Sequence, residues 1–207
     1  MHKFQEVFVR RARAELVCIQ ESEGVGLGEL DACVDVPGFR ILKSAVYGGV
    51  CSFVADELYL KLVREICVSK HWQIMVFEYG TADLPVRTVV VNMHLPDRSK
   101  GILFEKVLQE VTSSLDALWC EQGWKALLVA GDFNEQLPPL DGVCGSAVTG
   151  VGLGPRGQLL LEFAVRFHLE WSSTHGDTKY THILNNSCER RIIDYVLGSC
   201  GPGLAPV

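Results

Sequence analysis

The chain has 207 residues, of which 48% are hydrophobic and 21% are charged. This length and composition are typical of one folded domain with a sizeable core, and they exclude an extensively disordered chain. The formal net charge of −6 argues against a protein that binds by neutralising many phosphates. It does not exclude a site in which acidic residues hold a metal cation, because the cation then supplies the local positive charge.

The cysteines and the N-terminal segment indicate the cellular compartment. Eight cysteines are scattered without a CxxC pair, and no histidines cluster at zinc-ligand spacing, which predicts free thiols. The longest apolar runs are far shorter than the roughly 20 residues that span a bilayer. Residues 1–16 include acids where a secretory signal needs an uninterrupted apolar stretch. We therefore expect an intracellular protein, nuclear or cytoplasmic, without a membrane partner; no protein partner can be inferred.

The N-terminal half of the sequence predicts one helix followed by short strands. Residues 3–14 place apolar side chains at i, i+3, i+4 and i+8, which indicates an amphipathic helix. The apolar run at 16–19 predicts a strand covered on both faces, and it ends on the polar residues Gln20 and Glu21. After a glycine-rich loop, turn residues separate further predicted strands at 39–44, 48–55, 63–68, 74–77 and 86–94.

The C-terminal half contains longer helices. Leucines and valines spaced 4, 4, 4 and 3 residues apart predict a helix over 99–122 that stops at Gly123. A buried strand at 125–130 follows and runs into the sequence GDFN. We then expect a long loop at 135–157, a helix at 158–167, and strands at 169–172, 179–183 and 190–197. Strands and helices recur without strict βαβ alternation, which favours a layered α/β sandwich over a doubly wound sheet.

Three acids, Glu21, Asp132 and Asp194, each lie within or at the end of an apolar strand pattern. Burying a carboxylate is costly unless it is paired or bound to a metal. Each acid alone also fits a strand-end cap or a turn, but the three together indicate a site. Gly131 permits a tight turn, so Asp132 and Asn134 can point the same way. An acid that orients water beside an amide that binds a phosphate oxygen suits phosphoryl chemistry.

Four segments, taken in order, resemble the signature strands of the endonuclease/exonuclease/phosphatase superfamily: LVCIQES, VVVNMHLPD, LLVAGDFN and RRIIDYVLGS. The resemblance covers nearly the whole chain as a single domain, and residues 156–199 further resemble the endonuclease modules of non-LTR retroelements. It implies an α/β, DNase I-like fold, which is a two-layer β-sandwich flanked by helices. It also implies Mg²⁺-dependent phosphodiester hydrolysis, with endonucleolytic cleavage of DNA favoured.

The resemblance also assigns roles to individual residues. Glu21 corresponds to the metal ligand, with Mg²⁺ or Mn²⁺ as the expected ion because the donors are hard oxygens. His94 falls where family members contact the phosphate. Asp132 corresponds to the residue that aligns the attacking water, and Asn134 to the one that holds the phosphoryl group. Asp194 falls where an acid orients a catalytic histidine.

The sequence departs from the family pattern at both ends. Family members begin with a strand that bears an asparagine beside the metal, and they finish with a Ser-Asp-His strand. Neither pattern is found here, so we expect a partial domain with at most a trace of activity. No Asp-His pair occurs at the available histidines His2, His71, His168, His175 and His182. Alternatives are an inactive or decayed fragment, or a phosphatase or phosphodiesterase of the same superfamily acting on RNA, inositol phosphates or lipids.

A competing motif is Gly152-x-Gly154-x-x-Gly157, which matches the dinucleotide-binding fingerprint. We reject it because no buried strand precedes the glycines and Pro155 lies inside the motif. A glycine-rich loop explains the pattern.

Overall fold

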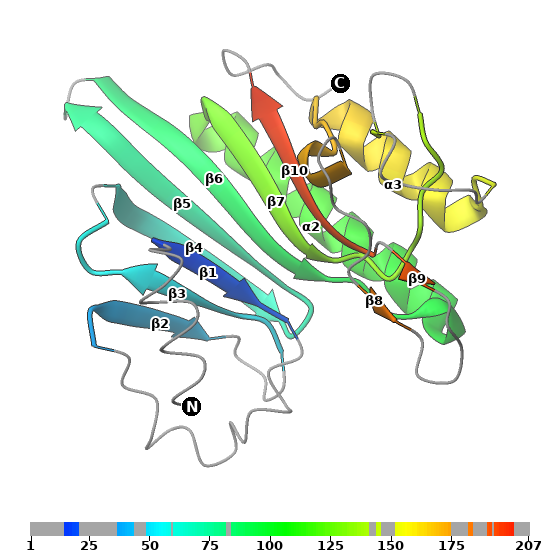
Figure 1. Cartoon of the computed structure of the whole chain (residues 1–207). Helices are drawn as coiled ribbons and strands as arrows, with labels where there is room; N and C mark the ends of the chain where they lie inside the picture. Colours follow the sequence, from blue (N-terminus) through cyan, green and yellow to red (C-terminus); the bar gives the residue numbers. More distant parts are fainter. Residues whose placement is uncertain are drawn as a thin grey trace.

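The computed structural model describes residues 15–20, 37–43, 49–58, 60–81, 84–140, 144–145, 152–174, 182–183, 190–191 and 193–200. In these ranges the strands form sheet A, sheet B and a short hairpin (Figure 1). The predicted helix at 3–14, the predicted loop at 23–31 and Glu21 lie outside the described residues.

Sheet A is antiparallel and has the strand order β1 (Leu16–Ile19), β3 (Cys51–Ala55) and β2 (Phe39–Lys43). Sheet B has the order β10 (Asp194–Cys200), β7 (Ala126–Asp132), β6 (Leu84–His94), β5 (Trp72–Thr81) and β4 (Lys61–Ser69). The hairpin pairs β8 (His182–Ile183) with β9 (Arg190–Arg191). In sheet B, β6 and β7 are parallel and the other neighbours are antiparallel.

The helices follow from this topology. Two neighbouring parallel strands need a crossover connection, which here consists of η3 (Arg98–Lys100) and α2 (Gly101–Gln122). The backbone N–H of Gly123 donates to the carbonyl of Trp119, and Gly123 has φ 63°, so the predicted glycine stop is confirmed. The chain continues through α3 (Pro155–Arg166) and η4 (Ser172–Thr174). Figure 1 shows α2 and α3 on the side of sheet B that faces away from sheet A.

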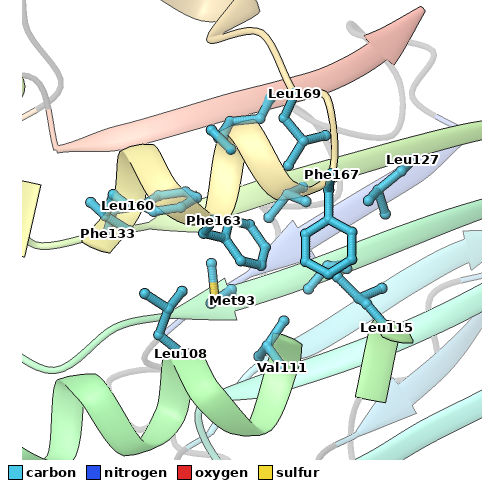
Figure 2. Close-up of a cluster of buried hydrophobic side chains, with 14 of the residues drawn as sticks. Met93, Leu108, Val111, Leu115, Leu127, Phe133, Leu160, Phe163, Phe167 and Leu169 are labelled. Atoms are coloured by element: carbon cyan, nitrogen blue, oxygen red, sulfur yellow. The ribbon is translucent and has the colours of Figure 1, made fainter. Parts of the chain in front are cut away.

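The two faces of sheet B are buried against different partners, because successive side chains of a strand point to opposite faces. On the outer face, Met93 of β6 and Leu127 of β7 pack with side chains of α2 and α3 (Figure 2). On the inner face, Met75, Phe77 and Val90 pack against Leu42 and Val54 of sheet A. The predicted two-layer sandwich flanked by helices is therefore confirmed.

Several predicted elements differ from the structure. The predicted strand at 169–172 consists of two isolated bridges, Glu170 with Gly198 and Trp171 with Cys144, followed by η4. The predicted strand at 190–197 is divided, since β9 pairs with β8 whereas β10 pairs with β7. Asp194 therefore starts a strand and does not lie in its middle. Finally, β7 extends past the predicted end at Ala130, because Gly131 and Asp132 continue the ladder to β6.

Two further observations concern the thiols and the membrane. Among the described residues, Cys18, Cys51, Cys67, Cys120 and Cys144 are not in disulfides. The helices in the described ranges are all too short or too polar to cross a membrane.

Gly131 permits the close approach of β6 and β7 at the end of the parallel ladder. A Cβ atom at this position would lie 1.7 Å from the carbonyl oxygen of Met93, which is backbone and cannot turn away. We predict that Gly131→Ala lowers the free energy of unfolding by about 1–3 kcal/mol or more, as measured by urea denaturation. Gly152→Ala is the control, because a Cβ at Gly152 meets nothing within 4 Å. Equal stability of the two variants would contradict this account of the β6–β7 contact.

Candidate active site

The end of the β6–β7 ladder brings three of the predicted site residues together. His94 of β6 is the register partner of Asp132 in β7, and Asp132 is the register partner of Asp194 in β10. Neighbouring strands lie about 4.8 Å apart, and directly opposite residues place their side chains on the same face. Three residues that are far apart in the sequence therefore lie side by side at the edge of the inner face of sheet B.

The turn after β7 holds Asn134 against this row. Asn134 has φ 49°, a left-handed conformation that asparagine tolerates better than most residues. Its backbone N–H donates to Oδ1 of Asp132 at 2.8 Å, and its side-chain Nδ2 donates to the carbonyl of Leu95 at 2.8 Å. The same Nδ2 lies 3.4 Å from Nε2 of His94. Asn134 is thereby fixed between the ends of β6 and β7.

Backbone hydrogen bonds from both neighbours hold the end of β7 in place. The N–H of Leu95 donates to the carbonyl of Asp132 at 2.8 Å, and the N–H of Phe133 donates to the carbonyl of Ile193 at 2.8 Å. Just after β6, the carbonyl of Pro96 accepts from the Arg156 guanidinium of α3 at 2.8 Å. The segment after His94 is therefore anchored to the helical layer.

His71 extends the row, although no sequence motif marks it as a site residue. It lies in the turn between β4 and β5, where its carbonyl accepts from the N–H of His94 at 2.7 Å. The two imidazole rings have centroids 6.0 Å apart. Within the described part of the chain, Nδ1 of His71 is buried and lacks a hydrogen-bond partner. We define the polar row as His71, His94, Asp132 and Asp194. Because His71 lies in a turn, it is not part of an apolar strand pattern in the sequence. Only the register between β5 and β6 shows that it lies beside His94.

Glu21, the predicted metal ligand, lies outside the described residues, but its neighbour Gln20 is described. Nε2 of Gln20 donates to Oδ1 of Asn92 at 2.7 Å, and Asn92 lies two residues before His94 on the same face of β6. The chain directly before Glu21 thus reaches the strand that carries His94. Among the described residues, no group of three or more histidines, cysteines, aspartates or glutamates is arranged to hold a metal ion. The metal site at Glu21 stays a prediction.

A separate groove of about 740 Å³ lies between α2 and α3. Its described lining includes Leu108, Leu159 and Phe163 together with the cation Arg166, which forms an ion pair with Asp116 at 2.8 Å. The groove is on the helical side of sheet B, whereas the polar row is on the face toward sheet A. A mostly apolar groove offers little for phosphoryl chemistry, so we assign the candidate site to the polar row.

The environment of His71 lowers its pKa from the ordinary value of 6.5, mainly through desolvation by burial and then through the nearby His94 and Lys70. The unfolded chain therefore binds a proton at this position more readily than the folded chain. We predict that stability falls as the pH decreases below about 6.5 and that His71→Asn reduces this fall. Urea denaturation at pH 8 and pH 5.5 measures it. An identical pH dependence in both proteins would contradict the assignment.

Comparison with known proteins supports the architecture. No protein-family model matches the sequence, and no curated protein does either. Among solved structures, the match to a mannosyl-6-phosphatase from Bacteroides thetaiotaomicron has a TM-score of 0.60 at 14% identity and covers 96% of this chain and 77% of that chain. An endonuclease/exonuclease/phosphatase family protein from the same organism matches with a TM-score of 0.57 at 14% identity, covering 96% and 74%.

A third match is TDP2 from D. rerio complexed with a single strand DNA product, with a TM-score of 0.54 at 10% identity over 96% of this chain and 76% of that chain. Identities this low show the fold alone. The chain therefore has the fold of the endonuclease/exonuclease/phosphatase proteins, as its strand motifs predict.

Proposed function

We propose that this protein hydrolyses phosphodiester bonds in a reaction that depends on Mg²⁺ or Mn²⁺, and that it cleaves DNA endonucleolytically. The observation that carries the proposal is the register of β6, β7 and β10, which aligns His94, Asp132 and Asp194 beside Asn134. DNA is favoured over other phosphate esters by the retroelement-like C-terminal sequence. The DNA product bound by the similar TDP2 structure adds support.

The side chains at the row suit the steps of this reaction. Asp132 orients the attacking water and can accept its proton. An asparagine amide has two N–H hydrogens, and Leu95 accepts one of those of Asn134. The other points to Nε2 of His94, and a phosphate oxygen bound beside the imidazole can replace Nε2 as its acceptor. These groups then stabilise the charge that develops on the phosphoryl oxygens.

The metal ion would be bound by oxygen donors next to this row. Glu21 is the proposed ligand, and carboxylates are the donors that Mg²⁺ and Mn²⁺ prefer. When bound, the ion polarises the phosphoryl oxygen and offsets its charge. This also explains how an acidic protein can act on a polyanion.

In the sheet, Asp132 lies between Asp194 and His94. Two strand spacings of about 4.8 Å separate Asp194 from His94, so these two side chains are not direct neighbours in the sheet. We keep for Asp194 the proposed role of orienting a catalytic histidine, and the partner is then a histidine other than His94.

We predict that Mg²⁺-dependent nicking of supercoiled DNA, however slow in the wild type, falls by ~10²–10⁴-fold in Asp132→Ala, because the water loses its general base. Asp116→Asn is the matched control, since it removes an acid that pairs with Arg166 in the helical layer. Conversion of supercoiled to relaxed plasmid on gels measures the rate. Equal nicking by Asp132→Ala and the wild type would contradict the site, and no nicking by the wild type would contradict DNA cleavage.

Binding of the metal ion can be measured without an assay of catalytic activity. We predict that Glu21→Gln weakens Mn²⁺ binding by at least ~10-fold in calorimetric titration, because it replaces a charged oxygen ligand. Glu15→Gln is the control, since Glu15 is exposed at the opposite end of β1. Unchanged Mn²⁺ affinity in Glu21→Gln, or tight binding of Zn²⁺ through cysteines in place of Mn²⁺, would be inconsistent with the proposed ligand.

A further inference from the structure

Residues 95–97 lead the chain from His94 to η3 and contact the turn after β7 on the way. The N–H of Leu95 donates to the carbonyl of Asp132 at 2.8 Å, and the carbonyl of Leu95 accepts from Nδ2 of Asn134 at 2.8 Å. The same Nδ2 lies 3.4 Å from Nε2 of His94. The position of residues 95–97 therefore determines where the Asn134 amide lies relative to the His94 imidazole.

Arg156 of α3 holds this segment from the helical side. Its Nη2 donates to the carbonyls of Pro96 and Asp97, each at 2.8 Å. Its Cζ lies 4.0 Å from the centroid of the Phe104 ring, and Phe104 is fully buried in α2. A guanidinium suits both contacts, because it donates hydrogen bonds along its edge and stacks on an aromatic ring with its face. Arg156 thus links α2 and α3 to residues 95–97.

The stability of α3 does not explain an arginine at this position. The helix begins at Pro155, so Arg156 lies in its first turn, where there is no acidic residue. The helix dipole favours acids in the first turn and cations in the last. Arg166 lies in the last turn and donates to the carboxylate of Asp116 in α2. A residue that opposes a local preference points to a function outside its own helix.

We propose that Arg156 is a positioning residue of the candidate site, which keeps residues 95–97 where they direct the Asn134 amide toward His94. Its catalytic consequence rests on the proposed function, whereas the contacts themselves lie within the described residues and involve no metal ion. Arg156 acts through the carbonyls of Pro96 and Asp97 and is not itself a catalytic residue. A displacement of about 1 Å between groups that act on one substrate can lower a rate ~10²-fold.

Three variants separate position from charge and from general packing. Arg156→Gln removes both the charge and the guanidinium, whereas Arg156→Lys keeps the charge and loses the flat donor that stacks on Phe104. Arg166→Gln is the matched control, since it also removes two hydrogen bonds of a guanidinium on α3, here those to Asp116.

Nuclear magnetic resonance measures the positioning without a substrate. We expect Arg156→Gln to speed hydrogen exchange of the Leu95 N–H by ~10-fold or more, because two hydrogen bonds from a charged donor are lost. It should also weaken the nuclear Overhauser effect between the Asn134 side-chain amide and the His94 ring. Arg156→Lys should change both signals in the same direction, and Arg166→Gln should change neither.

Nicking of supercoiled DNA measures the catalytic consequence. A misplaced Asn134 amide should lower kcat by ~10-fold or more in Arg156→Gln with little change in KM, because the lost interaction is made in the transition state. Loss of a cation that only attracts DNA would instead raise KM and leave kcat unchanged. Arg166→Gln should keep the wild-type kcat and KM.

The outcomes separate this inference from the proposed function. Wild-type exchange at Leu95 in Arg156→Gln, or equal changes in Arg156→Gln and Arg166→Gln, would overturn the positioning role and leave the proposed function intact. Wild-type signals in Arg156→Lys with a raised KM in Arg156→Gln would show an effect of charge and would also overturn it. Arg156→Lys decides the matter if Arg156→Gln does not fold. The expected exchange and Overhauser changes in a chain that does not nick DNA would support the placement of Asn134 by Arg156 and contradict DNA cleavage.

Discussion

The hydrogen-bond register between β6 and the strands on either side of it determines where every described residue of the candidate site lies. The parallel ladder from Thr88↔Ala126 to His94↔Asp132 places the polar ends of β6 and β7 at one edge. This ladder reaches its last pair only because Gly131 has no side chain to meet the carbonyl of Met93. A shift of the register by one residue would move Asp132 to the opposite face of the sheet and into the helical core.

The two faces of sheet B therefore have different roles. The outer face contributes to the stability of the fold, and the inner face carries the candidate site. The outer face is covered by α2 and α3, and its apolar side chains pack with those of the two helices in the large buried cluster (Figure 2). The inner face is apolar where sheet A covers it and becomes polar toward the strand ends, from Val90 through Asn92 to His94. Buried amides mark the transition, because they can bind backbone carbonyls of sheet A while still fitting the closely packed interior. The site lies at a well-supported edge of the fold, which favours a fixed geometry.

The sequence predicted the residues whose signal is local. The apolar run before Gly131-Asp132-Phe133-Asn134 indicated both a buried strand and a polar end, and the structure joins these features to His94. His71 could not be predicted, since its place depends on pairing between Trp72 of β5 and Met93 of β6. The complete burial of Asn92 could not be predicted either, because it depends on packing between two sheets. The apolar run at 190–197 gave no sign that this segment forms two strands, because the division depends on pairing: β9 pairs with β8, whereas β10 pairs with β7.

We propose that the polar row, and not the groove between the helices, is the place where a metal and a phosphate would meet. Paramagnetic broadening of histidine ring signals by Mn²⁺ in nuclear magnetic resonance spectra tests it most directly. We predict that substoichiometric Mn²⁺ broadens the ring signals of His94 and His71 and leaves His168, exposed just after α3, sharp. Broadening of His168 with His94 and His71 unaffected would contradict the claim.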